Sequence, residues 1–309
     1  MHLKILLFKF LSLVHMINCY NFIDSHVHVW SNGIQPFPLD SNPPDELAMC
    51  QISHLQNEMN QAGVTGALIV QPINHKFDHS YVASVLSERI KGMALLDPNA
   101  NNEYLPKLKS LGFIGVRFNP YLFDNSIMAC ESGEKLYKQA GELNMPVGFM
   151  CFKGLNQHYN DIQKLINLYP QTQIIIDHWG FIYQDGKYIE ESWNQLLSLA
   201  SYSNVYIKLS APFRNSNDGY SYNDLEKRLE ILINKFGTNR LMLGSDYPFI
   251  LQKEGYKKSW ECWNPNNNDS FGKILSKLNN DDLYNIQRGT VESLFGKWPD
   301  TICPLPSSS

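Results

Sequence analysis

Residues 22–30 read Phe-Ile-Asp-Ser-His-Val-His-Val-Trp, and the rest of the chain can be arranged around this stretch. Apolar residues alternate with Asp24, His26 and His28, which is typical of a β-strand, and side chains two apart on a strand share a face. Both imidazoles therefore point the same way. A pair of core histidines bonded to backbone carbonyls is one explanation. Neutral imidazoles side by side at a strand end favour the other, a metal or proton-transfer site.

Length, composition and charge narrow the class of protein. The chain has 309 residues and is 43% apolar, enough to bury the core of one large domain or two small ones. Its net charge of −4 gives no attraction for nucleic acid or for an anionic membrane. We therefore expect a small-molecule partner, and a homodimer is compatible with the sequence. The cysteines lack short-range pairing and predict free thiols without a disulfide framework: Cys19, Cys50, Cys130, Cys151, Cys262 and Cys303.

The two ends of the chain differ from its centre. Residues 1–20 have a basic start and an apolar middle, which is the outline of a secretory signal peptide, but Lys9 and His15 interrupt it. The segment is either a cleaved signal or an N-terminal extension, and the location is accordingly the secretory pathway or the cytoplasm. It is too short and too interrupted for a membrane span. Residues 299–309 predict a flexible tail, which leaves residues 21–298 as the folded domain.

Between these ends, short apolar runs alternate with segments of helical spacing. The runs predict eight strands: Phe22–Val29, Gly66–Gln71, Lys91–Leu96, Gly115–Asn119, Val147–Phe152, Gln173–His178, Val205–Ser210 and Leu241–Asp246. Apolar stripes predict helices within residues 52–62, 136–143, 162–169, 193–200 and 225–236, and less clearly within residues 86–90 and 104–111. Residues 281–294 would form the last helix, with Asp281 and Asp282 as caps.

Eight strands that alternate with helices over one domain length predict an α/β fold, the (β/α)8 TIM barrel. A doubly wound open sheet is the alternative, but no glycine-rich phosphate motif follows the first strand. The Asn-rich and aromatic-rich residues 253–270 lack periodicity and follow the last strand. We expect them to fold over the site as a lid.

Polar residues gather at the ends of the predicted strands, where barrel enzymes place their chemistry. Each residue alone has a structural explanation: Asp246 could cap a turn, Arg117 could pair with an acid and Lys153 could be solvated. Their convergence predicts an active site with catalytic residues Asp246, His178, His26 and His28. The substrate-binding candidates are Arg117, Arg214, Lys153, Asn74 and His75, although His75 could equally be a bystander, as could His79 and Cys151.

Four motifs, in this order, resemble the amidohydrolase superfamily, and specifically its amidohydrolase-related (amidohydrolase 2) branch of lactonases and decarboxylases. They are Ile-Asp-Ser-His-Val-His-Val-Trp (23–30), Gly-Val-Arg-Phe-Asn-Pro (115–120), Ile-Ile-Ile-Asp-His-Trp-Gly (174–180) and Leu-Gly-Ser-Asp-Tyr-Pro (243–248). The resemblance covers nearly the whole chain after residue 20. None of the motifs fixes the substrate.

The resemblance implies that His26, His28, His178 and Asp246 surround one or two divalent ions, usually zinc, in metal-dependent members. Those members have a further histidine on strand five, which residues 147–153 lack. The absence favours the metal-independent branch similar to 2-pyrone-4,6-dicarboxylate lactonase, although three imidazoles and a carboxylate could still close a zinc site. In that branch the histidines polarise the lactone carbonyl and the aspartate is the general base. Positions matching Arg117 and Arg214 bind carboxylates there.

The residue types also suit the hydrolysis of an ester-like carbonyl. Asp246 can serve as the base, the histidines or a metal can stabilise the oxyanion, and arginines can orient a carboxylate. We expect Asp24 to fix the histidine tautomers and Lys208 to neutralise a buried acid. The sequence thus predicts a hydrolase that opens a small carboxylate-bearing lactone or cyclic ester. A metal-dependent decarboxylase and a catalytically silent binding protein are the alternatives, and the intact polar cluster argues against silence.

Overall fold

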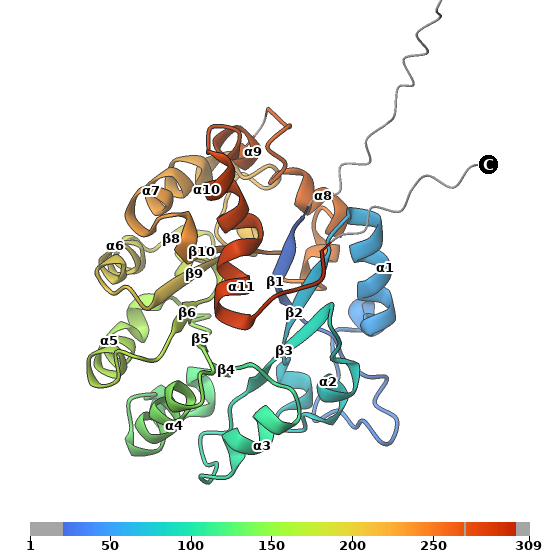
Figure 1. Cartoon of the computed structure of the whole chain (residues 1–309), viewed down its shortest axis with the longest axis vertical. Coiled ribbons are helices and arrows are strands. Elements are labelled where there is room, and N and C mark those ends of the chain that lie inside the picture. The colour runs from blue at the N-terminus through green and yellow to red at the C-terminus, as the bar shows by residue number, and fades with distance from the viewer. Residues whose placement is uncertain (1–20, 269, 301–309) are drawn as a thin grey trace, which may run out of the picture.

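The structure is a computed structural model that describes residues 21–268 and 270–300. Eight parallel strands form one sheet in the order β1-β2-β3-β4-β5-β6-β9-β10, and they make the central ring of Figure 1. The strands coincide with the eight predicted ones; six are shorter, one is shifted by one residue and one has the predicted bounds: β1 Ile23–Val27, β2 Gly66–Val70, β3 Ile90–Leu95, β4 Gly115–Phe118, β5 Val147–Phe149, β6 Ile174–Ile176, β9 Val205–Ser210 and β10 Leu241–Gly244. Two residue pairs, β7 Tyr183–Gln184 and β8 Lys187–Tyr188, form a separate small hairpin.

The last strand closes onto the first one. A parallel bridge joins Val27 to Tyr247, and the backbone N–H of His28 donates to the carbonyl of Tyr247 at 2.6 Å. One residue earlier, the N–H of Asp246 donates to the carbonyl of His26 at 3.0 Å. Closure leaves the sheet without a free edge. The predicted (β/α)8 barrel is therefore confirmed.

Helices surround the ring of strands (Figure 1). The predicted apolar stripes are buried, because the helices between the strands cover the outer face of the sheet. Within the described residues they are α1 Ile52–Ala62, α2 Ser80–Val85, α3 Tyr104–Ser110, α4 Glu131–Glu142, α5 Tyr159–Leu168, α6 Glu190–Ser198, α7 Glu226–Phe236, α8 Tyr256–Glu261, α9 Ser270–Leu275, α10 Asn280–Tyr284 and α11 Thr290–Phe295. None of them is long and apolar enough to cross a membrane.

Two helix predictions are wrong in detail. Residues 86–90 form no helix, because the backbone N–H groups of Ser87 and Ile90 each donate to the other's carbonyl and make a turn into β3. The final helical segment begins at Asn280, and its cap is Asn279, whose side chain accepts from the N–H of Asp282 at 2.9 Å. Asp281 and Asp282 lie in the first turn instead, where their charge still suits the helix dipole.

The predicted lid over residues 253–270 is also wrong for the described part of that stretch. Its helix α8 packs against β1: the ring of Trp260 stacks on Phe22 at 5.1 Å, and the hydroxyl of Tyr256 donates to Asp24 at 3.0 Å. Both side chains are buried. The aromatic residues that suggested a mobile cover are thus core residues.

The barrel interior is apolar at the end where the strands begin. Ile23, Leu68 and Met93 pack there with Val291 and Phe295 of α11 and with Trp298, and α11 lies across this end of the ring (Figure 1). The polar residues are therefore confined to the opposite, C-terminal end. Residues 1–20, with the predicted signal or extension, lie outside the described residues, as do residues 301–309 of the predicted tail. The described cysteines are free thiols: Cys50, Cys130, Cys151 and Cys262.

Gly66, the first residue of β2, leaves room for the ring of Trp298 at the end of the barrel where the strands begin. A Cβ atom at this position would lie 2.1 Å from Cδ1 of Trp298. We expect Gly66→Ala to destabilise the protein by about 1–3 kcal/mol through overpacking, as measured by denaturant unfolding. The cost should shrink in a Trp298→Leu background, where the ring is gone. An equal cost in both backgrounds would contradict the steric explanation.

Candidate active site

A cavity of about 250 Å³ opens at the C-terminal end of the strands. Its polar lining comes from six different strands or the loops that follow them: His28, Asn74, Arg117, Asn119, His178, Arg214 and Asp246. Phe181 and Phe249 flank it, each with its ring edge-on to a histidine, Phe249 to His28 at 5.9 Å and Phe181 to His178 at 5.0 Å. Most of the predicted site residues therefore converge on one cavity.

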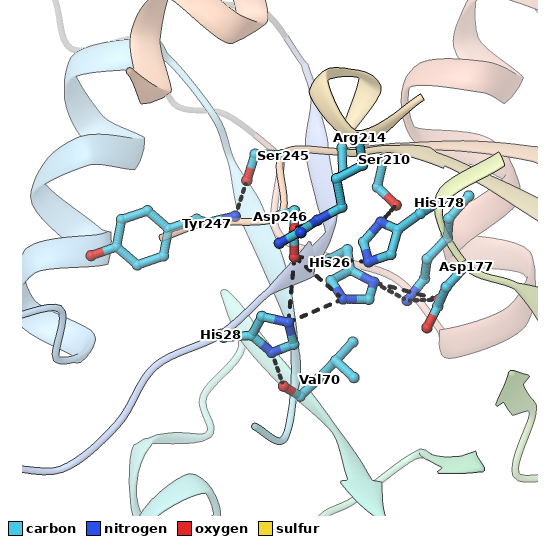
Figure 2. A network of polar contacts seen from close by, with 12 residues as sticks. His26, His28, Val70, Asp177, His178, Ser210, Arg214, Ser245, Asp246 and Tyr247 are labelled. Carbon is cyan, nitrogen blue, oxygen red and sulfur yellow. Dashed lines mark hydrogen bonds and ion pairs between the residues drawn. The ribbon is translucent and has the colours of Figure 1, made fainter. Parts of the chain in front are cut away.

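Three imidazoles surround one oxygen of Asp246 (Figure 2). The Nε2 atoms of His28, His178 and His26 lie 3.4, 3.8 and 3.9 Å from its Oδ1 atom. Nε2 of His26 is also 3.3 Å from Nε2 of His28. His26 does not line the cavity and is fully buried below it. The four residues predicted to be catalytic thus form one cluster.

The backbone holds two members of this cluster in a conformation that side chains rarely adopt. His178 has φ 50° and Asp246 has φ 62°, both in the left-handed region, and they lie in the loops that follow β6 and β10. Such a residue costs about 1–2 kcal/mol and persists where the surrounding structure enforces it. Residues in this region gather at functional sites, which agrees with the side-chain geometry.

Each imidazole has a partner for its second nitrogen. Nδ1 of His28 donates to the carbonyl of Val70 at 2.6 Å, which leaves a lone pair on Nε2 of the neutral ring. Nδ1 of His178 bonds the hydroxyl of Ser210 at 2.8 Å. Nδ1 of His26 faces two groups, Oδ1 of Asp177 at 3.4 Å and Nζ of Lys208 at 3.3 Å. The rings are therefore fixed in orientation.

Burial keeps two of the imidazoles neutral. It lowers the pKa of His178 to about 4, and it lowers the pKa of His26 well below its ordinary value, assisted by the charge of Lys208. For Asp246 burial raises the pKa, but the charge of Arg214 and the contacts with His178 and His28 together outweigh burial, and the net shift of the pKa is downward. At neutral pH the cluster thus offers imidazole lone pairs and a carboxylate, all of which are electron-pair donors.

These donors fit a divalent cation. One nitrogen each of His26 and His178 and one oxygen of Asp246 lie within 4.8 Å of one another. A tetrahedral zinc ion with nitrogen and oxygen ligands at about 2.0–2.2 Å needs those atoms about 3.3–3.6 Å apart. The imidazole nitrogens lie 3.4 to 3.9 Å from Oδ1 of Asp246, close to this spacing. His28 lies outside the three-residue group, although its Nε2 atom is near both His26 and Asp246.

The two arginines of the site are engaged differently. Arg214 donates from Nε to Oδ2 of Asp246 at 2.7 Å, and its guanidinium lies between the rings of Phe213 and Phe249, 5.0 Å from each. Arg117 is buried, with Nε 3.3 Å from Oδ2 of Asp177. Both line the cavity.

Other predicted residues lie apart from the cluster. Asn74 lines the cavity, with its amide donating to the carbonyl of Ser41 at 3.2 Å. His75 is buried outside the cavity, where Nε2 accepts from the N–H of Ser31 at 3.2 Å. Lys153 is exposed outside it, with Nζ 5.2 Å from the ring centre of Tyr121.

Of the two supporting roles expected from the sequence, the structure contradicts that of Asp24 and confirms that of Lys208. Asp24 touches no imidazole in the described structure: it accepts from the N–H of Ser245 at 2.9 Å and from its hydroxyl at 2.5 Å, so the expectation that it fixes tautomers is wrong. Burial raises the pKa of Asp24 to about 6. The expected role of Lys208 is confirmed, because its Nζ lies 3.4 Å from Oδ1 of the buried Asp177.

Sequence reasoning missed several residues of the cavity. Asn119 follows Arg117 by two positions, so the shared strand face could have identified it. Phe181 and Phe249 lie in loops without periodic spacing, and no local signal marks them. Sequence alone identifies Asp177 only as a strand-end acid, because its contact with His26 joins β1 to the end of β6, and these strands are not neighbours in the sheet.

Comparisons with known proteins agree with this geometry. Residues 23–276 match the model of the family described as "Amidohydrolase". The chain is 26% identical over 242 residues to 4-sulfomuconolactone hydrolase of Rhizobium radiobacter, which covers 73% of this chain and 75% of the relative. Among solved structures, a protein assigned as a 2-pyrone-4,6-dicarboxylic acid hydrolase from Acinetobacter baumannii, with citric acid bound, has a TM-score of 0.72 and 21% identity, covering 90% of this chain and 100% of that one.

A second solved structure shares the fold. An amidohydrolase from Burkholderia multivorans, solved with bound zinc, has a TM-score of 0.69 and 18% identity, covering 90% of this chain and 100% of that chain. At these identities the structural matches establish the shared fold. The match to the family model spans most of the chain and all four residues of the buried cluster. This protein therefore belongs to the amidohydrolase family.

Proposed function

We propose that this protein hydrolyses the ester bond of a small lactone that carries an acidic group. The observation that carries the proposal is the ionised carboxylate of Asp246 among three imidazoles, in a cavity that also exposes Arg117. A base, a group that stabilises an oxyanion and a carboxylate clamp are what this reaction needs. The sulfomuconolactone hydrolase relative supports a lactone as the substrate.

Asp246 is the proposed base. Its Oδ2 atom is held by Arg214, which leaves Oδ1 directed at the histidines and accessible from the cavity. A water molecule beside Oδ1 can pass a proton to this carboxylate as it attacks the lactone carbonyl. The low pKa of Asp246 makes it a weak base, so a second group has to activate the water or the carbonyl.

The proposed second group is the histidine cluster together with one divalent ion. His26, His28, His178 and Asp246 would hold it, and zinc there would act as a Lewis acid on the carbonyl. The donor set favours this arrangement, because neutral imidazoles and a carboxylate in mutual contact repel one another unless a proton or a metal lies between them. His178 can also donate a hydrogen bond from Nε2 when Ser210 donates to its Nδ1 atom.

Arg117 is the proposed anchor for the acidic group. Its Nε atom is turned toward Asp177, and no hydrogen bond is present on its terminal nitrogens among the described residues. These nitrogens can grip a carboxylate or sulfonate with two parallel bonds. Asn119 lies two positions further along the same strand end and can add an amide donor.

An assay with three readouts tests the function. Purified protein is offered a carboxymethyl-substituted unsaturated lactone, and ring opening, CO2 release and bound metal are measured together. We expect ring opening without CO2 and about one zinc per chain. CO2 release would indicate the decarboxylase, and binding of the lactone without turnover would indicate a silent binding protein.

Arg117→Lys tests the anchor. Lysine keeps the charge but cannot make two parallel bonds, so we expect KM for the acidic lactone to rise about 10-fold or more, with little change for its neutral methyl ester. Arg228→Lys is the matched control, because Arg228 lies over Tyr188 and does not line the cavity. Equal losses on both substrate forms would show that Arg117 braces the barrel instead of binding substrate.

A further inference from the structure

Three atoms meet beside the imidazole of His26, at the nitrogen that faces away from Asp246. Nδ1 lies 3.3 Å from Nζ of Lys208 and 3.4 Å from Oδ1 of Asp177, and those two atoms are themselves 3.4 Å apart. All three side chains are buried, so water does not compete for these contacts. An ammonium group can only donate a hydrogen bond and a carboxylate can only accept one. A hydrogen bond from Lys208 therefore requires a lone pair on Nδ1, whereas a hydrogen bond to Asp177 requires a proton there.

In one arrangement Lys208 donates to Nδ1 of His26. The proton of the neutral ring then sits on Nε2, 3.3 Å from Nε2 of His28. That atom carries a lone pair, because Nδ1 of His28 already donates to the carbonyl of Val70. The result is a directed chain of hydrogen bonds from Lys208 through His26 and His28 to Val70. This chain is complete without a metal.

In the other arrangement Nδ1 of His26 donates to Asp177. Nε2 then presents a lone pair to the lone pair of His28 at 3.3 Å and to the carboxylate of Asp246 at 3.9 Å. Three electron-pair donors at these separations repel one another unless a cation lies among them. Only this arrangement makes His26 a metal ligand.

We propose that Lys208 and Asp177 are positioning residues that hold His26 in one of two tautomers, and that their competition sets the affinity of the site for a divalent metal. Lys208 stabilises the metal-free arrangement and Asp177 the metal-binding one. The proposal depends on the proposed ligand set and not on the substrate. A failed lactone assay would therefore refute the function and leave this inference intact.

Nitrogen NMR of the full chain labelled with ¹⁵N-histidine tests the tautomer directly, because protonated and unprotonated ring nitrogens resonate far apart. In metal-free protein we expect His26, assigned with a His26→Asn variant, to carry its proton on Nε2. In Lys208→Met the proton should move to Nδ1. A proton on Nδ1 in the metal-free parent protein would overturn the proposal, and that measurement needs no variant of Lys208 to fold.

Zinc titration against a chromophoric chelator gives the second readout. Lys208→Met should bind zinc about tenfold more tightly, and Asp177→Asn about 10–100-fold more weakly, the range found for groups that orient metal ligands. General damage to the fold would weaken binding in both variants. Loss of zinc binding in Lys208→Met, or no zinc binding by either this variant or the parent, would contradict the proposal.

A change of charge alone would also tighten binding in Lys208→Met, so a charge control is needed. Arg117→Met removes a positive charge that pairs with the other oxygen of Asp177, without touching Nδ1 of His26. We expect the His26 proton to stay on Nε2 in this variant. A tautomer shift as large as in Lys208→Met would show that net charge, and not the hydrogen bond from Lys208, decides the state.

Discussion

Asp246→Asn is expected to lower turnover on the lactone at least about 100-fold, because asparagine keeps the shape of the side chain but cannot take a proton from water. The fold should survive, since Arg214 can still donate to the remaining carbonyl oxygen and the left-handed backbone at φ 62° is tolerated by asparagine. Turnover, thermal unfolding and zinc content are measured on the same preparation. Near-normal turnover would refute the role of Asp246 as the base.

Asp185→Asn is a matched control for this change. Asp185 also has a left-handed φ of 48° but lies exposed in the turn of the β7–β8 hairpin, outside the cavity. Its replacement should leave turnover and zinc content unchanged. If Asp246→Asn loses its zinc, turnover is measured again with zinc added, and a full recovery would assign the residue to metal binding alone.

Glu292→Gln is expected to destabilise the protein by about 3 kcal/mol at pH 7, because it breaks a buried ion pair. Oε1 of Glu292 accepts from Arg288 at 2.8 Å and from the N–H of Trp298 at 3.0 Å, and Oε2 accepts from Tyr284 and Lys297. The same Arg288 donates to Asn21 and to the carbonyl of Trp298. The variant therefore weakens the link between the two ends of the barrel domain.

The stability difference should depend on pH in a defined direction. Burial raises the pKa of Glu292, but the bonds from Lys297, the N–H of Trp298 and Tyr284, with the charge of Arg288, together outweigh it and lower the pKa from 4.5 to about 2. A group whose pKa is lowered by folding stabilises the fold above its unfolded pKa and loses that effect as the pH falls through its folded pKa. The gap between the parent and Glu292→Gln should thus shrink from pH 4.5 toward pH 2.

Denaturant unfolding at several pH values measures this gap, and Glu230→Gln is the control. Glu230 pairs with Lys277 at 3.9 Å on the exposed surface, where an ion pair contributes below about 1 kcal/mol. A constant gap for Glu292→Gln between pH 7 and pH 2 would contradict the ion-pair explanation.

Much of the fold could be predicted from local sequence, and so could the core of the site. Strands buried on both faces, such as Ile174–Ile176, are continuous apolar runs, and helices that cover them carry apolar stripes. Both signals depend only on neighbours along the chain. The same holds for His26 and His28, whose spacing puts them on one strand face, and for Asp246 at the end of its own strand.

The errors have two physical causes. The aromatic residues Tyr256 and Trp260 gave no periodic signal, and only contact with Asp24 and Phe22 shows that they belong to the core instead of a lid. Residues 86–90 combine helical spacing with a turn made by Ser87, and a local hydrogen bond prevailed over propensity.

The sequence by itself determined the barrel, its strands and the set of donors at their ends, because these follow from short-range periodicity and from the rule that parallel strands end together. Only the tertiary structure decided which residues meet. Closure of β10 onto β1 brings Asp246 to His26, and the packing of β6 and β9 places Asp177 and Lys208 against the same ring. Those contacts join residues up to 220 positions apart, since Asp246 and His26 differ by 246 − 26, and no local pattern encodes such a pairing.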